Sequence, residues 1–78
     1  MKPETEKKVR ERFRTILKVR SGSGLMDYAK TYAQAGLSLS GEALQLQIPY
    51  VLSNLGGWRG PEARVTKEFL RRAMKEDT

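Results

Sequence analysis

The residues best suited to binding chemistry lie in the segment SNLGGWRGPEAR, residues 53–64, which holds the single tryptophan of the chain. Trp58 and Arg59 are flanked by glycines and a Gly-Pro pair, which favour the end of one helix and the start of the next. There the indole ring could stack on a nucleic-acid base while Arg59, Arg64 and the first N–H groups of the helix bind a phosphate. The alternative is that Trp58 packs over the end of a helical bundle, which is the commoner role of a single tryptophan in a small domain.

A second group of candidates is the row of basic residues in the first twenty positions. This region holds eight lysines and arginines against three glutamates, and no acid follows Glu11 until Asp27. Such a row can run along phosphates, with each contact releasing counterions. The alternative is a solvated helix face whose basic end complements the helix dipole. Most of these cations follow one flank of a helix, with Arg12 toward the other, and the candidates are Lys7, Arg10, Arg12, Arg14, Lys18 and Arg20.

The residue types that the chain lacks exclude most catalytic chemistry. It has no cysteine and no histidine, so disulfides, thiolate or imidazole zinc sites and imidazole general bases are ruled out. Only Asp27 and Glu42 lie in uncharged surroundings, and neither has a neighbour that would complete an acid/base pair. We therefore expect no enzymatic activity, no metal or other cofactor and no small-molecule substrate.

The charge of the chain indicates the class of its partner. A formal charge of +6 on 78 residues favours a polyanion, and this charge is concentrated toward the two ends of the sequence. No stretch has the apolar length of a membrane span or of a signal peptide, so we expect a cytoplasmic protein. The leading hypothesis is binding to DNA or RNA, mainly through the phosphate backbone. The alternative is a protein-interaction or assembly module, in which the first helix docks onto a partner or a second copy.

Helical periodicity predicts the elements that position these residues. Apolar residues recur at helical spacing in the segments 2–20, 25–36, 37–57 and 60–77. In the third segment, Leu44, Leu46 and Ile48 also alternate as a strand would. We favour a helix kinked at Pro49, because the apolar spacing continues beyond this proline, which cannot donate a helical hydrogen bond.

The ends of these helices are predicted from capping residues. Ser40 suits the N-cap of the third helix, and Gly60 with Pro61 suits the start of the fourth. Gly36 and Gly56 are expected to end the second and third helices in the left-handed conformation. The remaining break, SGSG at residues 21–24, has the composition of a hinge or linker.

Together these patterns predict one all-α domain spanning residues 1–78. We expect a small four-helix bundle whose kinked third helix forms the centre and whose first helix is the outermost element. A core of this size is only marginally stabilising, and homodimerisation is one way to complete it.

Overall fold

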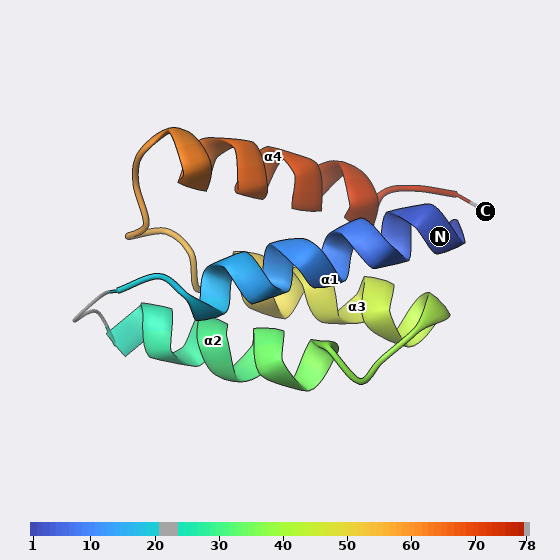
Figure 1. The fold of residues 1–78 in the computed structure, drawn as a ribbon, viewed down its shortest axis with the longest axis horizontal. Helices are drawn as coiled ribbons and strands as arrows, with labels where there is room; N and C mark the ends of the chain where they lie inside the picture. The colour runs from blue at the N-terminus through green and yellow to red at the C-terminus, as the bar shows by residue number, and fades with distance from the viewer. Residues whose placement is uncertain (21–23, 78) are drawn as a thin grey trace.

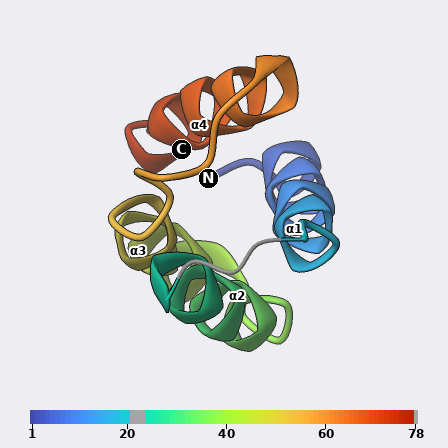
Figure 2. The same cartoon turned by 90° about the vertical axis from the view of Figure 1, so that its left-hand side faces the viewer.

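The computed structural model describes residues 1–20 and 24–77, which form a bundle of four helices (Figure 1). Consecutive helices run in opposite directions, and no strand occurs among the described residues. Viewed along the bundle, α2 and α4 lie at opposite corners, with α1 and α3 between them (Figure 2). The predicted all-α four-helix bundle is thus confirmed. Its helices are α1 (Pro3–Leu17), α2 (Gly24–Gly36), α3 (Gly41–Leu52) and α4 (Pro61–Met74).

The core consists of the apolar residues that recur at helical spacing on each helix. In α1, Val9, Phe13 and Ile16 are fully buried, as their spacing predicts. Burial of each such side chain contributes about 1.5–3 kcal/mol. Residues from all four helices complete the core, including Met26, Ala29, Ala33, Leu44, Ile48, Val51, Leu70 and Ala73.

Helix α3 continues through Pro49, so the strand interpretation of this segment is wrong. Pro49 itself is exposed and stands in the last turn of the helix. Ser40 occupies the N-cap position, but its side chain makes no capping hydrogen bond, contrary to expectation. The carboxylate of Glu6 replaces it, because Gly41 N–H donates to Glu6 Oε1 at 3.1 Å. The start of α3 is therefore capped by a side chain of α1.

Two glycines act differently from the prediction. Neither Gly36 nor Gly56 has a positive φ, and α3 ends instead at Ser53 in the right-handed conformation. Gly36 is the buried last residue of α2, where an added Cβ would lie 2.4 Å from Cε2 of Phe13. Close packing of α2 against α1, rather than backbone conformation, explains a glycine at this position.

The start of α4 follows the prediction. Gly60 occupies the N-cap with φ 110°, a conformation that L side chains rarely adopt, and Pro61 begins the helix. Of the predicted hinge at residues 21–24, positions 21–23 lie outside the described residues and Gly24 begins α2. The kink at Pro49 stays a prediction.

Candidate nucleic-acid interface

The turn between α3 and α4 holds Trp58 by its backbone. Trp58 N–H donates to the carbonyl of Leu55 at 3.0 Å, and Lys67 Nζ donates to the carbonyl of Trp58 at 2.6 Å. The side chain is half-buried and packs against the core. The packing role predicted for Trp58 is therefore present, while part of its surface stays accessible to a ligand.

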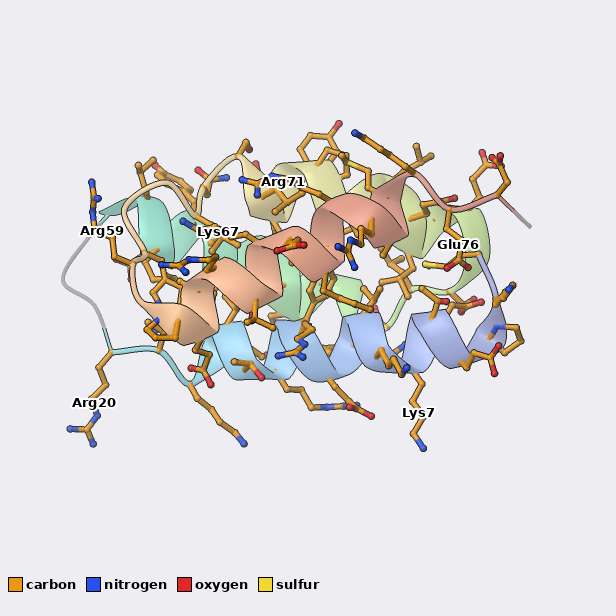
Figure 3. The ribbon with its side chains drawn as sticks, turned by 90° about the horizontal axis from the view of Figure 1, so that it is seen from above. Lys7, Arg20, Arg59, Lys67, Arg71 and Glu76 are labelled. Carbon is orange, nitrogen blue, oxygen red and sulfur yellow. The ribbon has the colours of Figure 1, made fainter. Side chains whose placement is uncertain are left out.

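Beside this turn lies an open depression in which half of the lining residues are cations. Arg59 comes from the turn, while Arg64, Lys67 and Arg71 come from α4. Figure 3 shows Lys67 and Arg71 on the flank of α4 that faces away from α1, and Arg59 at the end of the bundle where α4 begins. These four residues are called the α4 cation cluster below. The remaining lining residues are Trp58, Gly60, Ala63 and Glu68.

The helical repeat explains why these cations share one flank. Residues 64, 67 and 71 are separated by three and four positions, so their side chains project from neighbouring turns. The core-facing side of α4 carries Ala63, Thr66 and Leu70 instead, all of which are buried. Packing of this apolar side against the bundle leaves the basic flank facing solvent.

Positive charge in the cluster is poorly compensated. The pKa of Lys67 is lowered, first by burial of its ammonium group and then by the neighbouring charges of Arg71 and Arg59. Glu68 is the one acid among the described residues that line the depression, and its carboxylate forms an ion pair with Arg72 at 2.7 Å. An anion bound in the depression would therefore relieve repulsion between cations that the fold holds together.

Two of the predicted α1 cations have structural partners. Arg10 Nη2 donates to the carbonyl of Leu39 at 2.8 Å and to Glu6 Oε1 at 3.3 Å. Arg12 places its guanidinium 5.8 Å from the centre of the Phe69 ring, a cation–π contact between α1 and α4. These two arginines connect α1 to its neighbours, which limits their availability for a phosphate.

The other predicted cations of the N-terminal region are exposed, and none of them lines the depression of the α4 cation cluster. Lys7, Arg14, Lys18 and Arg20 are all exposed. Figure 3 shows Lys7 and Arg20 directed away from α4, beyond the opposite side of α1. The structure therefore divides the predicted residues into a row along α1 and a group at the start of α4, and does not combine them in one site.

Lys67 and Arg71 belong to the cluster but were not predicted as site residues. Glu68 forms its ion pair with Arg72 rather than with Arg71. The spacing of residues 64, 67 and 71 in the sequence was the signal that could have identified them. It becomes informative only when the buried side of α4 is known.

Comparison of the chain with protein-family models, with curated proteins and with solved structures found no match. Across residues 1–20 and 24–77, no three acidic side chains lie close enough together to hold a metal ion. None of the four described helices combines the length and the apolar character needed to cross a membrane.

Proposed function

We propose that this protein binds nucleic acid through the phosphate backbone, with the α4 cation cluster as the contact surface. The observation that supports this function best is the convergence of Arg59, Arg64, Lys67 and Arg71 on one depression with little acidic compensation. Phosphates are the anions that DNA and RNA present in continuous rows, and neutralising them releases condensed counterions. The exposed part of Trp58 at the edge of the depression adds a surface on which a base can stack.

The chemistry of the cluster favours backbone contacts over sequence recognition. Three of its four members are arginines, whose planar guanidinium groups bind phosphate oxygens through two hydrogen bonds at once. Such contacts orient the protein on the nucleic acid without distinguishing bases. We therefore expect similar affinity for oligonucleotides of different sequence. Binding, with no catalytic step, is the whole of the proposed function.

Salt dependence of binding tests this function. If all four cations of the cluster contact phosphates, the slope of log K against log salt on duplex DNA should be about −3.6. Affinity should then fall about 10²-fold between 50 and 200 mM salt. Titration of mixed-sequence duplex and single-stranded oligonucleotides, monitored by fluorescence anisotropy, measures both quantities. If the protein bound neither the duplex nor the single-stranded oligonucleotide at low salt, the proposal would be refuted.

Two charge-reversal variants distinguish the α4 cation cluster from the net charge of the protein. Arg64→Glu with Arg71→Glu should abolish binding at physiological salt, because both substitutions introduce acids into the cluster. Arg14→Glu with Lys18→Glu changes the net charge equally at exposed positions on α1 and at its C-cap, and should retain most of the affinity. Equal losses from the two variants would assign binding to net charge alone and contradict a site at α4.

A further inference from the structure

Helices α2 and α3 expose several large apolar side chains to solvent. Of the five large apolar residues that are most exposed in the described part of the chain, four belong to these two helices. Leu25 and Tyr28 of α2 are 48% and 63% exposed, and Leu46 and Tyr50 of α3 are 60% and 57% exposed. Apolar groups that are exposed together, rather than singly, are a feature of interaction sites.

These side chains form one continuous surface across the junction of α2 and α3. Along α2, Leu25, Tyr28 and Tyr32 follow one another at intervals of three and four residues. The Tyr32 ring reaches Tyr50 of α3, with ring centres 5.5 Å apart and planes inclined by 30°. Leu46 lies one turn before Tyr50. The α2–α3 apolar face is defined here as Leu25, Tyr28, Tyr32, Leu46 and Tyr50.

A hydrogen bond fixes the relative position of the two helices at this face. Gln47 Nε2 of α3 donates to the carbonyl of Tyr32 at 2.8 Å, beside the contact between Tyr32 and Tyr50. The backbone positions that carry the two tyrosines are therefore fixed relative to each other before any partner arrives. A preorganised aromatic surface loses less conformational entropy on binding than a mobile one.

The distribution of charge indicates what can approach this face. Residues 24–57 carry only Lys30 against Asp27 and Glu42, whereas the whole chain has a net charge of +6. Two copies that met through any of the arginine-rich surfaces would bring like charges together, which is unfavourable. The nearly neutral α2–α3 segment is the part of the chain where two copies can meet without this repulsion.

We infer that the α2–α3 apolar face is the interface of a homodimer with two-fold symmetry. In such an arrangement the same tyrosine and leucine side chains meet from both subunits, so a self-complementary apolar face is sufficient. A stable interface takes about 800 Å² from each partner. This area is about one sixth of the 5054 Å² that the molecule exposes.

In the bundle, α4 lies at the corner opposite α2, with α3 next to both (Figure 2). The inference does not rest on nucleic-acid binding. If both hold, the dimer carries two copies of the α4 cation cluster, and linked binding of two sites to one polyanion strengthens the interaction.

Sedimentation equilibrium of the full chain over a dilution series tests the interface. The wild-type protein should approach twice the 8.9 kDa chain mass at high concentration. Tyr28→Glu with Tyr50→Glu should reduce this mass by half, because it introduces four carboxylates into the paired face. Leu46→Glu should also lower the measured mass, and it leaves both rings of the Tyr32–Tyr50 pair in place.

Val65→Glu is the matched control, because Val65 is 52% exposed and lies on α4, away from the proposed interface. This variant should keep the wild-type mass, and circular dichroism should show unchanged helicity in all variants. A wild-type chain that remains at 8.9 kDa, or face variants that stay dimeric, would overturn the inference. A monomer that binds a hydrophobic dye at this face would also overturn it, and would assign the face to a different partner.

Discussion

Individual residues in this bundle have roles that their chemical type alone does not reveal. Arg10 and Arg12 lie two positions apart in a basic helix, yet one hydrogen-bonds to the carbonyl of Leu39 and the other stacks on Phe69. Gly36 has ordinary helical backbone and is instead required by the nearby Phe13 ring. At this scale, the contact partner of a side chain determines whether it serves stability or binding.

Gly36→Ala should destabilise the protein by about 1–3 kcal/mol, the usual cost of overpacking a core. The new Cβ would lie 2.4 Å from Cε2 and 2.8 Å from Cδ2 of Phe13, so the ring or α2 must move. Urea denaturation measures the free energy of unfolding. Gly56→Ala is the control, because no atom lies within 4 Å of its Cβ position, and it should be nearly neutral. Equal stability of Gly36→Ala and wild type would show that the ring moves aside without cost.

At the scale of helices, α3 is joined to each of its neighbours by bonds from side chains to backbone. Glu6 of α1 caps its start, and Gln47 reaches the carbonyl of Tyr32 in α2. Gln45 faces α4, where its Nε2 donates to the carbonyls of Ala73, Met74 and Glu76. Met74 is the last residue of α4, and its carbonyl is one of those that lack a helical partner. The third helix therefore also completes the end of α4.

Gln45→Ala should destabilise the bundle by about 1–2 kcal/mol, because the carbonyls of Met74 and Glu76 lose the Gln45 donor. Thermal unfolding followed by circular dichroism would measure the change. Gln34→Ala on α2 removes an exposed glutamine of the same size and should alter the midpoint little. A Gln45→Ala midpoint as high as that of Gln34→Ala would mean that water satisfies the end of α4 equally well.

For the molecule as a whole, the two ends of the chain lie together (Figure 1). Glu76 joins them, because its carboxylate accepts from Lys2 N–H at 2.8 Å and from the Thr5 hydroxyl at 2.8 Å. These two hydrogen bonds, that of Lys2 first, lower the pKa of Glu76 below its ordinary value of 4.5. Contact between the ends therefore favours the ionised carboxylate and stabilises the closed bundle.

A lowered pKa in the folded state predicts that stability depends on pH through Glu76. Its contribution is fully present above the unfolded value of 4.5 and is lost as pH falls from there through the folded pKa. The thermal midpoint of Glu76→Gln should be below that of wild type at neutral pH, and the gap should narrow with acidification below 4.5. Asp77→Gln, at an exposed position beside it, serves as control. A gap that is independent of pH would contradict this role.

Local patterns in the sequence determined the secondary structure and the core. Burial of Val9, Phe13 and Ile16 follows from their spacing, since residues three or four positions apart share one side of a helix. Gly60 and Pro61 likewise specify the start of α4 through their own backbone preferences. Helical spacing alone does not fix how deeply each apolar residue lies, because Val65 of α4 and Tyr28 of α2 follow the helical stripes and are nevertheless exposed.

Only the tertiary structure decided which cations act together. Which flank of a helix faces solvent depends on its rotation and on its neighbours, and residues far apart in the sequence determine both. Packing of α4 therefore places Lys67 and Arg71 in one depression with Arg59 and Arg64. Packing of α1 gives Arg10 and Arg12 contacts within the bundle, whereas Lys7 and Arg20 point away from α4. The amount of positive charge is a property of the sequence, whereas its division between binding and packing is a property of the fold.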